Sequence, residues 1–287
     1  MGTGKIGVIG GSGLYAMTAL ENVREVEVTT PFGPPSDAYI VGTLHGRDMV
    51  FLPRHGRGHR LPPSAINFRA NIYGLKSLGV EWVIAVSAVG SMPEEIQPGH
   101  LVIPDQFIDR TRSRVSTFFE ELTVHVALAD PVCAVVGHAL HQAAAATGAT
   151  VHFGGTYLCM EGPQFSTRAE SRLYRQWGVD VIGMTNMPEA KLAREAELCY
   201  ATLALATDYD CWHVSAADVD IGAILAILQR NVQLAQDVIT RTVPQLQGTR
   251  TCLCSTALQT AIITDRAMIP TAVRERLGLL IDRYLTA

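Results

Sequence analysis

The sequence predicts an α/β fold, in which a β-sheet is flanked by helices, organised as a single domain over residues 1–287. Three observations carry this prediction. Short apolar segments such as 5–9, 81–86 and 199–206 have the length and composition of strands buried in a sheet. Longer segments with helix start and stop signals lie between them, and no linker or repeat divides the chain. A hydrophobic content of 48% against 17% charged residues indicates a large packed core.

The first third of the chain fits a meander of strands better than a strict βαβ repeat. A first strand breaks into the glycine-rich turn at 10–13, and alternating apolar residues then lead to a hairpin at 45–48. A helix begins near Ser64 and is stopped by Gly79. The expected elements are strands at 5–9, 23–30, 38–44 and 49–52, a helix at 63–78 and a strand at 81–86.

Strands and helices alternate in the rest of the chain. The expected strands lie at 101–108, 150–160, 180–184 and 199–206, and the expected helices at 131–146, 167–177, 185–197, about 219–245 and 270–287. The polar loop at 109–125 is long, which favours a binding or interface role over that of a simple connector.

Composition and charge exclude several classes of protein. A net charge of −4 and a pI near 6.1 provide no basic field for nucleic acid, and no apolar run is long enough to span a bilayer. The first residues lack the apolar core of a signal peptide, so we expect a cytoplasmic protein with a small-molecule partner. The six cysteines lack zinc-site spacing, which predicts free thiols and no metal. A redox role for the CxC pair Cys252 and Cys254 is the alternative.

Four expected strand ends carry side chains suited to an oxyanion. Ser12 lies in the glycine cluster, where backbone N–H groups can approach an anion closely. Arg54 opens a basic loop with His55, and arginine is shaped to hold phosphate bidentately, with a solvated charge run as the alternative. Ser87 follows a buried strand, and Thr185 can cap the next helix or hold an anion at its N-terminus. Phosphate is therefore the expected ligand.

A fifth strand, at 199–206, is followed by Asp208 and Asp210. Spacing of two puts both carboxylates on one side of an extended segment, and two acids in a half-buried site repel, so that one holds its proton near neutral pH. In open α/β sheets the ligand crevice lies beyond the carboxyl ends of the strands, where such a general acid would stand. The alternative is a solvated turn.

The glycine turn supports a second function from a different class. Gly11, Gly13 and Ala16 fit GxGxxA, with Glu25 or Glu27 at the distance of a ribose-binding acid, as in a NAD-dependent oxidoreductase. The strand expected from residue 23 leaves room for only about two helical turns, which argues against this fold. If the strand ends instead meet at one sheet edge, phosphate lies beside a protonated carboxyl, a layout suited to phosphorolysis of a glycosidic bond.

Nine segments, in chain order, resemble the family of trimeric purine nucleoside phosphorylases that includes the 5'-methylthioadenosine phosphorylases, and the resemblance as a whole runs from Ile6 to about Arg241. The segments are GVIGGSGL, TPFGPPSDA, RHGRGH, NFRANIYGL, SAVGS, DQFIDRT, EGPQFSTRAE, MTNMPEA and ATDYDCW. The resemblance implies the nucleoside phosphorylase fold, a mixed sheet surrounded by helices. It also implies a homotrimer, with the pairing of trimers into hexamers left open.

The resemblance implies a site without a cofactor, in which inorganic phosphate is a co-substrate. Phosphate would be held by Ser12, Arg54, His55, Ser87, the Ala88 amide and Thr185. The nucleoside would be held by Phe165, Val89 and Gly90 at the purine, Met184 at the ribose, Asp208 as proton donor to purine N7, and Asp210 supporting the 6-amino group.

The residues at two positions imply which purine base the substrate carries. Relatives that cleave 6-oxopurine nucleosides place Glu where Ser166 stands and Asn where Asp208 stands, so this chain fits a 6-aminopurine. Phosphorolysis of 6-oxopurine nucleosides or methylthioinosine is the alternative, and a nucleoside-binding relative without activity is another. Ile221 and Ile224 would form an apolar wall for a 5'-methylthio group. His125 matches a histidine that relatives contribute across the subunit interface.

The chain departs from the family pattern at a few positions. Gly183 stands where some relatives carry Asn, and Ser12 replaces a frequent Thr. The loop from Arg114 to His125 is short beside some eukaryotic relatives, which bears on the expected role of His125. The CxC pair resembles pairs that form disulfides in some relatives, but no disulfide is assumed here.

Overall fold

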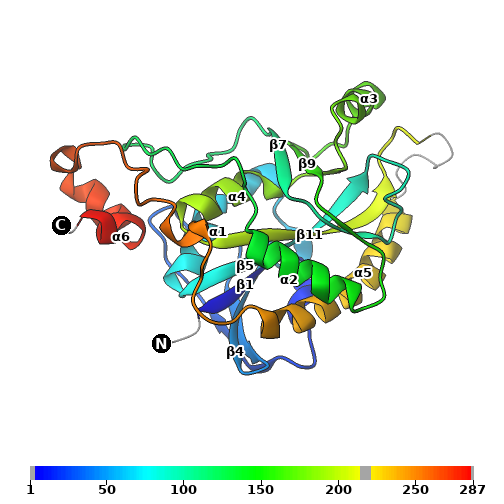
Figure 1. The fold of residues 1–287 in the computed structure, drawn as a ribbon, viewed down its shortest axis with the longest axis horizontal. Coiled ribbons are helices and arrows are strands. Elements are labelled where there is room, and N and C mark those ends of the chain that lie inside the picture. Colours follow the sequence, from blue (N-terminus) through cyan, green and yellow to red (C-terminus); the bar gives the residue numbers. More distant parts are fainter. Residues whose placement is uncertain (1–3, 214–220, 286–287) are drawn as a thin grey trace.

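The structure of the protein is a computed structural model that describes residues 4–213 and 221–285, apart from the side chains of residues 12, 15 and 221–229. These residues form one mixed β-sheet of eleven strands with helices on both faces (Figure 1), so the predicted α/β fold is confirmed. The strands are β1 (Lys5–Gly10), β2 (Glu21–Val26), β3 (Tyr39–Leu44), β4 (Arg47–Pro53), β5 (Val80–Ser91), β6 (Leu101–Ile103), β7 (Gln106–Arg110), β8 (Val151–Phe153), β9 (Thr156–Met160), β10 (Val181–Gly183) and β11 (Cys199–Tyr209). The helices are α1 (Phe68–Ser77), α2 (Ala134–Ala145), α3 (Arg168–Gln176), α4 (Asn186–Glu195), α5 (Ile221–Thr242) and α6 (Thr271–Leu285). None of the described helices is both long enough and apolar enough to cross a bilayer.

The long strand β5 is the hub of the sheet. β11 pairs with it in parallel along one edge, from Trp82 to Ser91. β1 pairs with the other edge in parallel only as far as Ala85, and β10 joins that same edge in antiparallel fashion at Gly90. Among the described residues, the segment 86–89 therefore has no strand partner on this edge. The sheet opens here, in the middle of the molecule.

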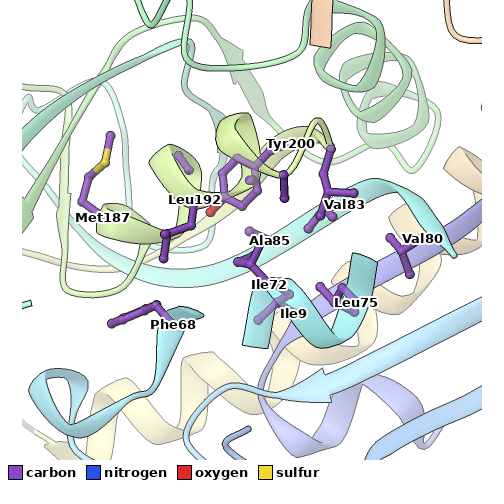
Figure 2. Close-up of a cluster of buried hydrophobic side chains, with 14 of the residues drawn as sticks. Ile9, Phe68, Ile72, Leu75, Val80, Val83, Ala85, Met187, Leu192 and Tyr200 are labelled. Atoms are coloured by element: carbon purple, nitrogen blue, oxygen red, sulfur yellow. The ribbon is translucent and has the colours of Figure 1, made fainter. Parts of the chain in front are cut away.

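Two hydrophobic clusters cover the two faces of the sheet. On one face, α1 and α4 pack their apolar residues, such as Ile72 and Leu192, against Ile9 and Ala85 of the central strands (Figure 2). On the other face, α2 and α5 pack together over the sheet, and Val136 of α2 belongs to this second cluster. Burial on both faces explains why the central strands are apolar in nearly every position.

Several predicted boundaries were wrong for local reasons. The expected strand at 101–108 is broken at Pro104, which has no N–H to donate to a ladder, and the one at 150–160 is broken at Gly154 and Gly155, whose φ angles are +90° and +105°. The expected strand at 23–30 ends at Val26. The hairpin turn is only His45 and Gly46, both at positive φ, as a two-residue hairpin requires.

The predicted helix at 63–78 begins five residues later. Pro63–Ala65 is a separate 3₁₀ turn, and Asn67 caps α1 by accepting a hydrogen bond from the N–H of Ala70 at 3.1 Å. β5 and β11 both continue past their predicted ends at Val86 and Ala206, because each strand gives the other a partner out to Ser91 and Tyr209. Ser87 and Asp208, which were expected beyond the strand ends, therefore lie inside the strands, and Asp210 directly follows β11.

Candidate active site

A single cavity of about 730 Å³ opens where β1 and β10 part along the edge of β5. It receives most of the residues that the sequence singles out. They are Arg54, His55, Ser87, Ala88, Val89, Gly90, Phe165, Met184, Thr185, Asp208 and Asp210. The expected meeting of these residues therefore occurs. They gather along the edge of the central strand β5, between β1 and β10, and not at an outer edge of the sheet.

The other predicted site residues are placed differently. The side chains of Ser12, Ile221 and Ile224 lie outside the described residues, although Gly11 and Gly13 on either side of Ser12 line the cavity. Ser166 is half-buried and does not line it; its hydroxyl lies 3.6 Å from the sulfur of Met160, which does.

His125 is exposed and lies outside the cavity of its own chain. Its N–H donates to the carbonyl of Ala261 at 2.9 Å, next to the bridge that Val124 forms with Ile262. A role for His125 across a subunit interface stays a prediction.

Arg54 follows β4 and is 2% exposed. Its Nε and Nη2 donate to both oxygens of Glu189 at 2.8 and 2.9 Å, Nη1 donates to the carbonyl of Val86 at 2.9 Å, and Nη2 reaches that of Ile9 at 3.4 Å. The bidentate face of the guanidinium, which we expected to hold phosphate, is thus occupied by Glu189. Since the group has five N–H donors, one on Nη1 is left for an anion.

Glu189 is a functional residue that the sequence did not single out. It is fully buried in α4, and it also accepts a hydrogen bond from the hydroxyl of Tyr200 at 2.9 Å. Burial alone would lower the pKa of Arg54, but the charge of Glu189 raises that pKa above its ordinary value. The guanidinium therefore stays charged, and its two hydrogen bonds to Glu189 fix it beside the cavity.

The edge of β5 provides donors beside this arginine. Backbone groups alternate along a strand, and because the carbonyl of Val86 points at Arg54, the N–H of Ala88 faces the same side. The hydroxyl of Ser87 lies 3.3 Å from that of Thr185 and 3.1 Å from that of Tyr157. Ser87 and Thr185 are each only 6% exposed. Two hydroxyls and a backbone amide thus gather at one end of the cavity.

Thr185 occupies the N-cap position of α4, yet its side chain makes no cap hydrogen bond. Of the two sequence interpretations, capping or holding an anion, the geometry favours the second. Met187 has the extended angles φ −118° and ψ 132°, so the regular part of α4 begins only after it, and what Thr185 offers to an anion is its hydroxyl.

The basic loop after Arg54 divides between the cavity and the surface. His55, His59 and Arg60 line the cavity, whereas Arg57 pairs with Glu25 and Asp37 in solvent. Burial lowers the pKa of His55 to about 4, although its Nδ1 lies 2.8 Å from the carbonyl of Leu61. His55 is therefore neutral at pH 7 and offers hydrogen bonds but no charge.

The acid pair lies at the other end of the cavity. Thr207 forms a bulge in β11, because Ala206 pairs with Val89 and Asp208 pairs with the next residue, Gly90. Such a bulge re-aims the side chains that follow it. The Thr207 hydroxyl donates to Asp208 Oδ1 at 2.7 Å. Both acids line the cavity and neither belongs to a solvated turn, so that alternative was wrong.

The two carboxyls resist ionisation because they are buried. Burial raises the pKa of Asp208 to about 6, the Thr207 hydrogen bond opposes this, and the charge of Asp210 adds to it. Asp210 is 3% exposed, its pKa is also raised by burial, and its Oδ2 has no hydrogen-bond partner among the described residues. Asp208 therefore keeps its proton to a higher pH than a solvated aspartate does, an unsatisfied carboxyl oxygen of Asp210 lies beside it, and its role as a general acid stays a prediction.

Arg114, in the loop after β7, is another residue that the sequence did not single out. Its Nη1 donates to the carbonyls of Met184 and Met187 at 2.6 and 2.7 Å, and its Nη2 donates to that of Glu161 at 2.6 Å. The side chain is 1% exposed. It ties the segment that leads to Phe165 to the segment that holds Thr185. The Met184 carbonyl, expected to meet a sugar, already accepts this hydrogen bond.

Tyr157 explains one departure from the family pattern. A Cβ added at Gly183 would lie 2.0 Å from the Tyr157 hydroxyl, so an Asn at position 183 is incompatible with tyrosine in this place. The tyrosine is fully buried and reaches Ser87 instead.

The dinucleotide alternative is wrong. A short 3₁₀ turn, Ser12–Tyr15, follows the glycines, where a dinucleotide fold needs a long helix. Glu25 lies in β2 and pairs with Arg57.

Comparisons with known proteins identify relatives of the chain. The chain matches the Phosphorylase superfamily over residues 5–244. It is 61% identical to an S-methyl-5'-thioadenosine phosphorylase of Geobacter sulfurreducens over 98% of this chain and 99% of the relative, and 57% identical to one of Koribacter versatilis over 98% and 96%.

Solved structures give the same result. The crystal structure of a methylthioadenosine phosphorylase from an antarctic soil metagenomic library has 48% identity and a TM-score of 0.93, with 98% of this chain and 100% of that chain covered. A variant of the adenosine/methylthioadenosine phosphorylase of Schistosoma mansoni, in complex with methylthioadenosine, has 32% identity and a TM-score of 0.81, with 97% and 98% covered.

The pair of Arg54 and Glu189 generates a testable prediction. Glu189→Gln removes one charge of a fully buried pair, and we expect a loss of about 3–5 kcal/mol in the free energy of unfolding, measured by denaturant titration. Glu25→Gln is the matched control, because Glu25 also pairs with an arginine, Arg57, but in solvent; it should change stability little. Equal losses in the two variants would contradict the importance of burial.

Proposed function

The chain belongs to the S-methyl-5'-thioadenosine phosphorylase family of the phosphorylase superfamily, and we propose that it cleaves S-methyl-5'-thioadenosine with phosphate to give adenine and 5-methylthioribose 1-phosphate. One observation carries the proposal: hydroxyl and amide donors for an anion line one end of a cavity, and an aspartate with a raised pKa lines the other. Ala88 and Gly90, which mark these ends on β5, are two residues apart, or about 7 Å. A ribose fits between them.

The chemistry follows from this arrangement. Phosphate held by Thr185, Ser87, the Ala88 amide and the free N–H of Arg54 lies below the sugar and attacks its anomeric carbon as the bond to the purine breaks. The sugar acquires oxocarbenium character, which a neighbouring anion stabilises. Asp208 gives its proton to purine N7, so the base leaves neutral. The leaving base needs this proton because a purine anion is a poor leaving group.

The base end of the cavity fits a 6-aminopurine. Asp210 has an oxygen without a partner among the described residues, and a 6-amino group can donate a hydrogen bond to it. Phe165 is 53% exposed at the cavity wall, where an aromatic ring can stack on the purine. The remaining proposed contacts to the nucleoside are those of Val89, Gly90, Met184 and Ser166.

The apolar wall for the methylthio group is proposed to come from α5. Its described part contributes Val232 to the cavity, opposite Gly13. Ile221 and Ile224 belong to the same helix. An apolar wall favours a thioether over a hydroxyl, since a buried hydroxyl without a partner is costly.

We propose that the chain is a single domain over residues 1–287 and assembles as a homotrimer. His125 supports this proposal, because it is exposed and does not line the cavity of its own chain. In the assembly it would complete the site of a neighbour.

A substrate panel tests the proposed function. Initial rates are measured on S-methyl-5'-thioadenosine, adenosine, 5'-deoxyadenosine and inosine, with and without phosphate. We expect the highest kcat/KM on S-methyl-5'-thioadenosine, no turnover without phosphate, and inosine poorest. The 6-oxo group of inosine is an acceptor and cannot donate to Asp210, and Ser166 provides no carboxylate to accept from its N1–H. Inosine as the best substrate would contradict the base assignment.

Asp208→Asn tests the general acid. Asparagine keeps the shape but holds no transferable proton, so we expect kcat to fall by about 10²–10⁴-fold while the KM for phosphate is unchanged. Because the pKa of Asp208 is about 6, the ratio of wild-type to variant kcat/KM should fall as the pH rises through that value, and the titration of phosphate cancels in this ratio. Asp48→Asn, at an exposed site, is the control. A ratio that is flat with pH would remove Asp208 from this role.

Thr185→Val tests the anion subsite. The change is nearly isosteric and removes one hydroxyl donor, so we expect the KM for phosphate to rise by about 10- to 100-fold, which corresponds to about 1.5–3 kcal/mol for a hydrogen bond to a charged group. The KM for the nucleoside should change little. Thr147→Val, at the turn after α2, is the matched control. An unchanged phosphate KM in Thr185→Val would place phosphate elsewhere.

A further inference from the structure

Four of the six cysteines come together away from the cavity. The sulfurs of Cys133, Cys199, Cys252 and Cys254 all lie within 4.8 Å of one another. They come from three parts of the chain: the start of α2, the start of β11, and the short 3₁₀ turn Leu253–Thr256 in the C-terminal segment. The spacing of cysteines in the sequence could not reveal this cluster, because Cys133 and Cys199 have no cysteine near them in the chain.

We propose that these four cysteines form a structural zinc site, in which one Zn²⁺ is held by four thiolates. A tetrahedral Zn²⁺ with Zn–S bonds of about 2.3 Å separates its sulfurs by about 3.8 Å. The observed limit of 4.8 Å for every pair, with Cys199 and Cys252 at 3.2 Å, leaves room for a single ion between the sulfurs after small adjustments. Two disulfides would need only two close pairs, whereas here all four sulfurs are mutual neighbours.

The orientation of the CxC segment supports ligation. Leu253, between the two cysteines, is 82% exposed, while Cys254 is 4% exposed and Cys252 is half-buried. Hydrophobic burial alone would turn the leucine inward, since it has the larger apolar side chain. The segment instead presents both sulfurs to the cluster and the leucine to solvent.

The surroundings also favour thiolates. Cys133 is the N-cap of the twelve-residue helix α2, and its side chain makes no cap hydrogen bond. The positive end of the helix dipole therefore faces the cluster, and cysteines at helix N-termini ionise more readily. Binding replaces the four thiol protons by one Zn²⁺, and the protons are released to solvent.

Such a site would fasten the C-terminal segment to the sheet. After the CxC turn, this segment pairs with the loop that carries His125: the N–H of Ile263 donates to Thr123 and that of His125 donates to Ala261, each at 2.9 Å. Cys199 is also the first residue of β11, the strand that carries Asp208. The proposal concerns stability and does not depend on the proposed reaction.

Metal analysis of the full-length protein tests the proposal. The protein is produced in zinc-supplemented medium and purified with a reductant but no chelator, and zinc is measured by plasma mass spectrometry. We expect one zinc per chain, and after exchange into Co²⁺ the intense visible bands of tetrahedral sulfur coordination. Removal of the metal with a chelator at low pH, followed by neutralisation, should lower Tm, and added Zn²⁺ should restore it.

Variants locate the ligands. Cys199→Ser and Cys254→Ser should each lose the stoichiometric zinc, whereas Cys211→Ser, a cysteine outside the cluster, should retain it. If the ligand variants fail to fold, the zinc content and the Co²⁺ spectrum of the wild-type protein still show whether the cluster binds a metal. Wild-type protein without stoichiometric zinc that also binds no Co²⁺ would overturn the proposal. So would alkylation of the denatured protein that finds four of its cysteines joined in disulfides.

Discussion

The stretch 86–89 of β5, which has no strand partner on one edge among the described residues, is the constraint from which the site follows. A strand edge presents backbone N–H and C=O groups that need partners, and a buried edge cannot leave them to water. At residues 86–89 a side chain replaces the missing strand, because Arg54 donates a hydrogen bond to the carbonyl of Val86. The amide of Ala88 faces the cavity, where phosphate would accept its hydrogen bond in the proposed reaction. The gap arises because β1 and β10 approach the same edge from opposite directions and stop short of each other. One irregularity of the sheet thus creates both the space and the donors.

Buried charges hold the walls of this gap in place. Arg54 and Glu189 join the end of β4 to α4, and Arg114 joins the loops that follow β9 and β10. Both arginine side chains are buried away from water, so each guanidinium depends on acceptors fixed in the protein. Removing such an acceptor leaves a buried charge without compensation. Rigid donors cost little reorganisation when charge develops on a substrate, which is the condition for electrostatic stabilisation of a transition state. The hydrogen bonds of Arg54 and Arg114 therefore stabilise the fold and also hold the proposed phosphate-binding end of the cavity in a fixed geometry.

Part of this arrangement could be predicted from the sequence, and the rest could not. Short hydroxyl side chains that follow apolar strand segments, such as Ser87 and Thr185, are local signals, and so is the acid pair, so the sequence alone points to these residues. Glu189, Tyr157 and Arg114 act through partners that are distant in the chain, and a single residue without a pattern gives no signal. The bulge at Thr207 depends on which residue of β5 it meets, and the meeting of Cys133 with Cys254 depends on the whole fold. Long-range register is what a single sequence does not contain.

The acid end shows that function and stability oppose each other in this fold. The pKa of Asp208 is raised from 3.8 to about 6 by burial, which means that the folded chain holds this proton more tightly than the unfolded chain. The protonated Asp208 therefore contributes its full stability below pH 3.8, and this contribution is lost as the pH rises through about 6. Near neutral pH the folded protein therefore bears the cost of a buried, partly ionised carboxyl, with Asp210 beside it. A fully solvated aspartate would remove that cost, but it would have no proton to give a departing base at the pH of the cell. The core packed on both faces of β5 and β11 supplies the stability that keeps the acid buried.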